Sequence, residues 1–506
     1  MIACPNCGAN LRFDAKTQRM VCDFCGSDFD PKQFDVENDA EEQSMAQEAE
    51  PAEDDGFETY DVTVYTCPQC GGELMSVDEN TAAAFCSFCG ASTILSSRIA
   101  KEKRPEFIIP FSITKEDCKE AYRKLVKRAL FIPKEYKSEK CIDGFRGIYM
   151  PYWSYDVKQS GPVKLNGQTE HRSGDYIITK HYSLTGNIDA EYDGLSYDAS
   201  SSFSDDISEA LAPYDITKRQ PFEPSYMSGF YADIADVGKE VYSKQASALA
   251  YNHSLERIKS ETREFRKYTI TGDNKSNDKP GTAFSSRTMK GYSAMFPVWF
   301  MSYRNGDRVT YATVNGQTGK VAADLPIDPK KYLFFSGILA VVIFILLNLF
   351  LVLTPKAVLL TASVLTIIVF VINGLQRTDI RKAETGEDDK GVIFKKGQER
   401  LKNLKNEKEK TKEEKEEAFK KLITNPSEVK MPGPEKAITI VGVISIVIGL
   451  LMAFFLDVVS DIPYYLLCIL DAVVFMVCFR YTLINYNRVA TRRLPQFDRK
   501  GGDDRA

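Results

Sequence analysis

The chain has 506 residues, of which 27% are charged and 43% are hydrophobic, and its formal net charge is −5. At about 100–200 residues per domain, this length leaves room for several domains. The acidic balance excludes a protein that a global basic field holds on nucleic acid. The first residues carry no basic segment followed by an apolar run, so we expect no signal peptide. Only three histidines are present, so a histidine-based metal centre is not expected.

Eight of the twelve cysteines form two similar modules, predicted at residues 1–30 and 60–97. These cysteines are Cys4, Cys7, Cys22, Cys25, Cys67, Cys70, Cys86 and Cys89. In each module two CxxC pairs lie fourteen or fifteen residues apart, a spacing that can place four thiolates tetrahedrally around one Zn²⁺. A glycine follows each pair, where a tight knuckle needs a positive φ. The sequence therefore predicts two Cys4 zinc ribbons, each with one structural Zn²⁺, since four cysteines leave no open coordination position.

Residues 31–59, between the two modules, are rich in Glu, Asp, Ala and Gln, and we expect them to form a flexible acidic linker. A short basic run follows the second module at 98–104. The second module itself offers few basic side chains, and the acidic linker would repel phosphate. We therefore interpret the ribbons as protein-interaction modules. The alternative is a nucleic-acid binder that uses the basic run and a helix at 115–130 as its surface.

Residues 105–330 have the composition of a folded, β-rich α+β domain. Strand-like runs rich in Tyr, Val, Ile and Thr occur at 147–157, 175–186, 292–303 and 307–321. Helical runs occur near 204–212 and 235–267. Thr114 precedes a turn with two acidic residues and is the predicted N-cap of the first helix. The apolar face of that helix is predicted to hold Ala121, Leu125, Leu130 and Phe131.

Two features of this domain indicate packing rather than catalysis. The only tryptophans, Trp153 and Trp299, lie in similar aromatic runs. We predict two edge strands that pack both indoles into a shared core, and the alternative is a binding groove that both indoles line. The octapeptide VNGQTGKV at 314–321 lacks the glycine spacing of a phosphate-binding loop, and its Asn-Gly pair predicts a hairpin turn. Because GxSxG and HExxH motifs are also missing, we expect a protein that is not an enzyme.

Four hydrophobic segments in the last third predict membrane-spanning helices. They lie at 332–353, 357–374, 437–456 and 464–479. Short turns join them into two hairpins, 332–374 and 437–480, while the loop at 375–436 and the tail at 481–506 are rich in Lys and Arg. By the positive-inside rule, both termini and the loop face the cytoplasm. The loop is predicted to be a solvated, charged helical hairpin, and the alternative is a coiled-coil arm for a partner.

Asp471 lies inside the fourth hydrophobic segment. A carboxylate at that depth is costly and usually functional or paired. A transport or assembly role that depends on Asp471 is therefore one hypothesis. Against a specific role, Asp471 lies within about two helical turns of the predicted outer end, close enough to reach water at the membrane interface.

The two ribbons, the PYW run at 151–153, the octapeptide and the hydrophobic tail together resemble a bacterial family of zinc-ribbon membrane proteins. The resemblance covers about residues 60–375 and is most specific at 67–71 and 314–321. Members are often labelled transcription-factor-type zinc-ribbon proteins or primosomal replication-restart helicases, although the ATP-binding motifs of a helicase are missing here. The chain is also similar to zinc-ribbon membrane proteins of Gram-positive bacteria that sit beside phage-shock and flotillin-like (SPFH) proteins.

This resemblance implies a scaffold on the cytoplasmic face of the membrane that recruits envelope-stress proteins. The predicted architecture is multidomain, with two small zinc ribbons, a β-rich cytoplasmic domain, and a four-helix transmembrane region with a charged helical loop. The predicted function is that of a non-enzymatic, multi-pass protein of the cytoplasmic membrane that recruits protein partners. A membrane-tethered nucleic-acid binder is the alternative.

Overall fold

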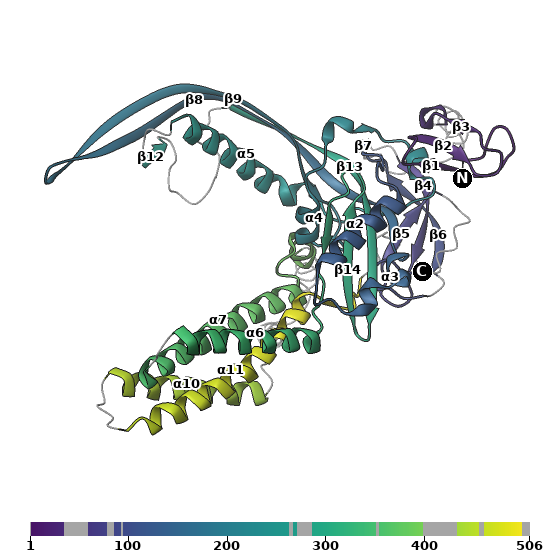
Figure 1. The fold of residues 1–506 in the computed structure, drawn as a ribbon. Helices are drawn as coiled ribbons and strands as arrows, with labels where there is room; N and C mark the ends of the chain where they lie inside the picture. The colour runs from purple at the N-terminus through teal and green to yellow at the C-terminus, as the bar shows by residue number, and fades with distance from the viewer. Residues whose placement is uncertain are drawn as a thin grey trace, which may run out of the picture.

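The computed structural model describes residues 2–34, 59–77, 85–92, 95–262, 267–270, 286–350, 354–397, 433–454 and 460–497. Most of the predicted acidic linker and most of the predicted charged loop lie outside the described residues. The described chain forms a central β-rich body with a cysteine ribbon at one end (Figure 1). Two arms project from this body toward the same side, one a long β-ribbon and the other a bundle of helices (Figure 1).

The first ribbon has its own antiparallel sheet of β1 (Leu11–Asp14), β2 (Arg19–Cys22) and β3 (Asp28–Phe29). This sheet packs on the central body rather than standing free. The Phe13 amide donates to the Ser228 carbonyl over 3.0 Å, and the Phe13 ring meets that of Tyr226 edge-on at 5.2 Å. Met20 is completely buried in the same core. The small ribbon therefore gains apolar burial from the neighbouring domain, which a module of this size cannot supply alone.

The central body contains one large sheet. Its bounds are β4 (Thr59–Thr66), β5 (Glu73–Ser76), β6 (Ser96–Lys103), β7 (Phe107–Ile108), β8 (Arg146–Ser173), β9 (Tyr176–Asp198), β10 (Gln220–Pro221), β11 (Tyr231–Asp233), β12 (Lys267–Ile270), β13 (Ser286–Asn305), β14 (Arg308–Asn315), β15 (Val321–Ala323) and β16 (Arg492–Arg493). The main strand order is β10-β7-β13-β8-β11-β5-β4-β6. β8 and β13 lie in the interior and pair antiparallel over a long register.

The second ribbon is part of this sheet and not a separate module. Its strands β4, β5 and β6 continue the large sheet through the pairing of Met75 with Ala232 of β11. The basic run at 98–104 lies mostly in β6, at the end of the main strand order. The sequence alone predicted a separate module because the strand that pairs with β5 lies more than 150 positions further along the chain.

Helices cover the sheet at several points. Their bounds are α2 (Lys115–Arg128), α3 (Glu139–Ile142), α4 (Asp205–Leu211) and α5 (Glu240–Glu261), with short 3-10 turns at Pro31–Gln33, Lys134–Lys137, Ile216–Lys218 and Pro224–Met227. Thr114 caps α2 in a reciprocal pair with Asp117, as predicted. The predicted apolar face of α2 is wrong, because the buried side chains are Cys118, Tyr122 and Val126. Leu130 is 75% exposed just beyond the helix.

The two indoles do not share a core, and the strands that carry them are not edge strands. Trp299 of β13 lies opposite Gly147 of β8, six positions from Trp153. Trp299 Nε1 donates to the Ile113 carbonyl over 2.9 Å, whereas Trp153 Nε1 donates to the Val237 carbonyl over 2.7 Å. The indoles therefore pack into separate clusters on one sheet, and the prediction of a shared core is wrong.

β8 and β9 leave the body as a two-stranded ribbon with α5 beside it (Figure 1). Their pairing runs from Tyr152 to the turn that follows Ser173. Near this tip, Tyr176 is 78% exposed and Ile177 is 72% exposed. The predicted strand at 175–186 is confirmed, but its alternating residues are exposed on both faces. The projecting arm is a feature that strand propensity alone did not indicate.

The VNGQTGKV octapeptide forms the predicted hairpin turn between β14 and β15. The Asn315 amide donates to the Lys320 carbonyl over 2.8 Å, and the Gly319 amide donates to the Asn315 carbonyl over 2.9 Å. Gly319 has φ +76°, a conformation that glycine adopts without steric cost. Gly319 therefore serves the turn of this hairpin.

The same turn fastens the segment after α4 to the sheet. The buried Asn315 side chain accepts from the amides of Gln317 and Thr318 and donates to the Leu211 carbonyl over 3.0 Å. The Gln317 amide group pairs with both backbone groups of Asp215, at 2.7 and 2.9 Å. Four polar groups of two side chains are thus satisfied by backbone, which explains their burial.

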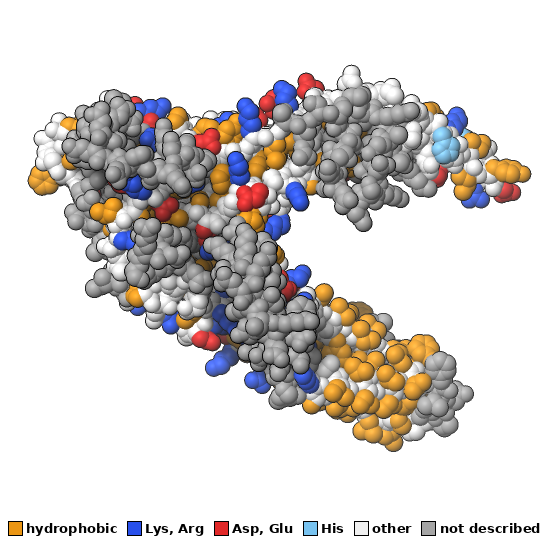
Figure 2. All heavy atoms as spheres, turned by 180° about the vertical axis from the view of Figure 1, so that it is seen from behind, with side chains coloured by type: hydrophobic (Ala, Val, Ile, Leu, Met, Phe, Trp, Pro, Cys, Tyr) orange, Lys and Arg blue, Asp and Glu red, His pale blue; other side chains and the backbone are white. Residues whose placement is uncertain are grey.

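Four helices in the last third are long and apolar enough to cross a membrane, in agreement with the predicted spans. They are α6 (Pro329–Phe350), α7 (Pro355–Thr385), α10 (Gly433–Phe454) and α11 (Ile462–Val489). Their hydrophobic side chains cover the outside of the bundle (Figure 2). α7, α10 and α11 contact one another, whereas no residue in the most apolar stretch of α6 is buried within the protein.

α7 and α11 continue well beyond the predicted hydrophobic segments, and these extensions attach the bundle to the sheet. Glu384 of α7 forms ion pairs with Arg308 of β14 at 3.6 Å and with Arg493 of β16 at 3.2 Å. Asn487 of α11 accepts from the Ile327 amide and donates to the Ile327 carbonyl, at 2.8 and 2.9 Å. The basic residues after the fourth span therefore partly form a strand and a helix end, rather than a free tail.

We predict that Asn315→Ala lowers the free energy of unfolding of the sheet domain by about 2–4 kcal/mol, because it leaves buried backbone groups without partners. Tryptophan fluorescence during urea unfolding in detergent measures this change. Asn305→Ala is the matched control, since Asn305 also precedes a glycine in a hairpin turn but is exposed. Equal stability of the two variants would contradict the fastening role.

Candidate metal centres

Each ribbon brings its four cysteine sulfurs together as the spacing predicted. In both clusters all four Sγ atoms lie within 4.8 Å of one another. The closest pairs are 3.5 Å in the first ribbon and 3.7 Å in the second. Four sulfurs at about 2.3 Å from one tetrahedral metal would be about 3.8 Å apart, so both sets fit a single ion. Among the described residues, these are the two groups of candidate ligands with such geometry.

The four CxxC knuckles share one backbone design. In each, the residue after the second cysteine is a glycine whose amide donates to the carbonyl of the first cysteine, as in Gly8 to Cys4 over 2.8 Å. The four glycines have φ between +68° and +74°, as predicted from the sequence. The chain therefore turns back on itself tightly enough to aim both sulfurs at one point.

The two centres differ in their exposure. In the second ribbon all four cysteines are buried, whereas Cys7 and Cys25 of the first are exposed. Hydrogen bonding with the Ser27 hydroxyl and then with the Ser27 amide lowers the pKa of Cys25 to about 6. This favours the thiolate, which is the form that binds metal. Both sites can hold a metal through sulfur alone, but only the first stands at the protein surface.

Asp471 is the centre of a buried polar cluster in the helix bundle. Its carboxylate is completely buried and accepts from the Ser363 hydroxyl of α7 over 2.8 Å and from the Ser445 hydroxyl of α10 over 2.6 Å. The expectation that Asp471 reaches interfacial water is wrong. The carboxylate instead links three helices, and the sequence signal that could have revealed its partners is a lone serine in each of two apolar segments.

A second polar cluster lies further along the same helices. Asn373 of α7 donates to the Cys478 carbonyl over 3.1 Å and accepts from Thr482 and Asn485 of α11. Hydrogen bonds of this kind fix how apolar helices pack, because lipid provides no hydrophobic drive between them. The bonds of Asn373 therefore join α7 to α11.

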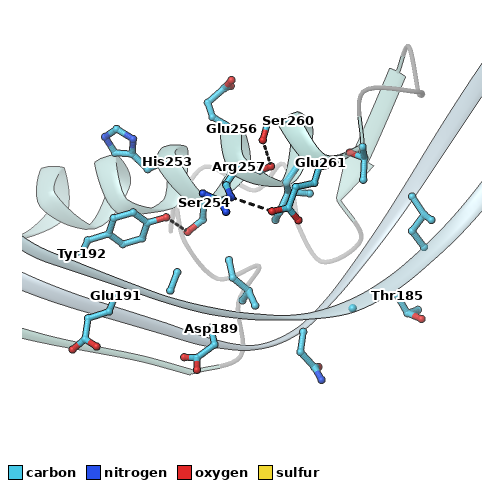
Figure 3. Close-up of a pocket in the computed structure, with 17 residues that line it drawn as sticks. Thr185, Asp189, Glu191, Tyr192, His253, Ser254, Glu256, Arg257, Ser260 and Glu261 are labelled. Atoms are coloured by element: carbon cyan, nitrogen blue, oxygen red, sulfur yellow. Dashed lines mark hydrogen bonds and ion pairs between the residues drawn. The ribbon is translucent and has the colours of Figure 1, made fainter.

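A cavity of about 930 Å³ lies between α5 and the β8–β9 arm (Figure 3). Its acidic lining residues are Asp189, Glu191, Glu256 and Glu261. Arg257 pairs with Glu261 at 3.0 Å, and the hydroxyls of Tyr192 and Ser254 lie 2.7 Å apart. The lining contains no cysteine, and its excess of carboxylates does not suit a phosphate-containing substrate. We assign no chemistry to this cavity.

Comparison with known proteins adds one relative. The chain is 29% identical over 340 residues to YdjG of Bacillus subtilis, which is described as an uncharacterized protein. The alignment covers 66% of this chain and 93% of the relative. No protein-family model matches the chain, and no solved structure matches it.

We predict that Ser363→Ala with Ser445→Ala lowers the stability of the helix bundle by about 1–3 kcal/mol, because the buried Asp471 carboxylate loses both donors. Thermal unfolding in detergent, followed by size-exclusion chromatography, measures the effect. Thr361→Ala is the control, since Thr361 is exposed on α7 and bonds only within its own helix. A double variant as stable as this control would show that the cluster does not hold the helices.

Proposed function

We propose that the protein is a non-enzymatic, multi-pass scaffold of the cytoplasmic membrane that recruits other proteins during envelope stress. The observation that carries this proposal is where apolar side chains remain exposed outside the bundle. Phe24 of the first ribbon is 83% exposed, and Tyr176 at the arm tip is 78% exposed. At the arm tip Ile177, Ile178 and Tyr182 are exposed along with Tyr176, and a group of exposed apolar side chains suits contacts with protein partners.

In this proposal both ribbons, the sheet domain and both termini face the cytoplasm. The sidedness follows from the excess of Lys and Arg in the loop at 375–436 and after the fourth span. Reduced cysteine ligands also belong in the cytosol, where thiols are kept reduced. The resemblance to zinc-ribbon proteins beside phage-shock and SPFH proteins supports a role in recruiting such partners at the membrane.

The metal in both centres is, in this proposal, Zn²⁺. Four thiolates in tetrahedral arrangement suit zinc, and a closed set of four protein ligands is typical of a structural ion. Each ion then stabilises a ribbon and takes no part in a reaction.

The alternative function is binding of nucleic acid by the basic run and α2. Side-chain pairing within the protein weighs against it. Lys119 pairs with Asp143 at 2.8 Å and Arg123 with Glu139 at 2.6 Å, while Lys124 pairs with Glu120 in its own helix. Basic groups that are already neutralised contribute less to phosphate binding.

We predict two Zn²⁺ per chain, released in two phases by a thiol-modifying reagent. The ion of the first ribbon leaves quickly because Cys7 and Cys25 are exposed. The ion of the second ribbon, whose cysteines are buried, leaves at least about tenfold more slowly. Metal analysis measures the Zn²⁺ content of the chain, and a colorimetric chelator measures the rate at which Zn²⁺ is released. The variant Cys7→Ser with Cys25→Ser should keep only the slow ion. One common rate for both ions would contradict the prediction.

We predict that the full chain, purified from detergent-solubilised native membranes, brings down a protein partner that resists nuclease. The double variant Cys7→Ser with Cys25→Ser should lose this partner, because the first ribbon no longer folds around its metal. These cysteines are preferred to those of the second ribbon, whose loss would disturb the whole sheet. Nucleic acid that co-purifies alone and disappears with nuclease would instead support the alternative function.

A further inference from the structure

The two ribbons repeat one motif but differ in what covers it. Each has a phenylalanine directly before its last cysteine, Phe24 in the first ribbon and Phe88 in the second. Phe24 is 83% exposed and Phe88 is 1% exposed. The difference cannot come from the knuckles, because their backbone turns are alike. It comes from the surroundings of each ribbon.

In the second ribbon, Phe88 packs in the core of the sheet domain against Phe300, with ring centroids 6.3 Å apart. The segment that follows β16, residues 494–497, covers the knuckles from the other side. The Phe497 amide donates to the Cys70 carbonyl over 2.7 Å. The Phe497 ring meets the Phe88 ring edge-on, with centroids 5.4 Å apart. The segment thus recognises one knuckle through its backbone and the other through an aromatic contact.

The knuckle glycines show the same contrast. A Cβ atom added at Gly71 would lie 2.1 Å from the Phe497 carbonyl oxygen, and one added at Gly90 would lie 3.2 Å from Arg304 Cβ. At Gly8 and Gly26, the matching positions of the first ribbon, no described atom lies within 4 Å. The first ribbon therefore presents the same surface without the segment that covers it in the second.

Among the residues that the structure describes, no second segment of this kind lies on the first ribbon. Each chain has two ribbons but a single 494–497 segment, which the second ribbon already holds. A second copy of the chain also has a single 494–497 segment, which its own second ribbon holds. Beside Phe24, Asp23 pairs with Arg12 at 2.7 Å, so charge contributes little to this surface and an aromatic contact dominates.

We propose that Cys7, Phe24 and Cys25 form a docking surface for an extended, phenylalanine-containing segment of a partner protein. The segment binds as residues 494–497 bind the second ribbon, with a backbone amide on the Cys7 carbonyl and an aromatic ring against Phe24. This inference rests on the proposed scaffold function and specifies the chemistry of its partner.

The first test uses a fluorescent peptide with the sequence of residues 491–500, TRRLPQFDRK, and the full chain in lipid nanodiscs. Saturable binding to one site per chain is expected, weakened about tenfold or more by Phe24→Ala and by Phe497→Ala in the peptide. Tyr176→Ala, at the distant arm tip, should bind as the unmodified chain does. Equal binding by Phe24→Ala, or no saturable binding, would overturn the proposal.

The second test places the photo-crosslinker p-benzoylphenylalanine at position 24 in native membranes. Cross-links to an aromatic-containing segment of another protein support the proposal, while cross-links only to this chain, to a second copy or to lipid overturn it. Failure of this docking surface and failure of the scaffold function give different results. If the partner from the membrane purification stays bound to Phe24→Ala, the scaffold function stands and this docking surface is wrong.

Discussion

The antiparallel pairing of β8 with β13 is the interaction on which the other parts of the molecule depend. It joins fifteen residue pairs, from Ser286 with Ser160 to Phe300 with Arg146. β8 continues outward as the arm, and through β11 it leads to the second ribbon. β13 pairs with β14, which connects to the helices. Arm, ribbon and membrane bundle are therefore held by one pair of strands far apart in sequence.

The two ribbons show how one sequence motif is placed in two different surroundings. Their cysteine spacing, knuckle hydrogen bonds and glycine conformations agree closely. The second ribbon is part of the large sheet, Phe497 packs on its Phe88, and its four cysteines lie in the core of the domain. The first ribbon packs on the domain through one side only and leaves its knuckles at the surface. The two repeats of the sequence motif thus differ in their structural surroundings.

In the helix bundle, a few polar groups supply what apolar surfaces cannot. Lipid and helix side chains are equally apolar, so burial alone does not select one arrangement of helices. Asp471 with its two serine donors, and Asn373 with its partners on α11, define which faces of α7, α10 and α11 meet. α6 makes no comparable polar contact with these three helices among the described residues, and its Tyr332 ring lies 6.1 Å from that of Phe479 on α11.

The local sequence pattern was sufficient to predict several features of this protein. Cysteine spacing, apolar run length, the Thr114 cap and the Asn-Gly turn each depend on residues close together in the chain. The structure confirms the two four-cysteine clusters, the four long apolar helices, the cap and the turn. Tertiary structure alone decided which face of α2 is buried, where the indoles pack, and that the second ribbon joins the sheet. It also decided that Phe88 is covered while Phe24 is exposed. Several of these outcomes depend on contacts between residues far apart in the chain, such as Trp153 with Val237 and Phe88 with Phe497, and local periodicity carries no information about such contacts.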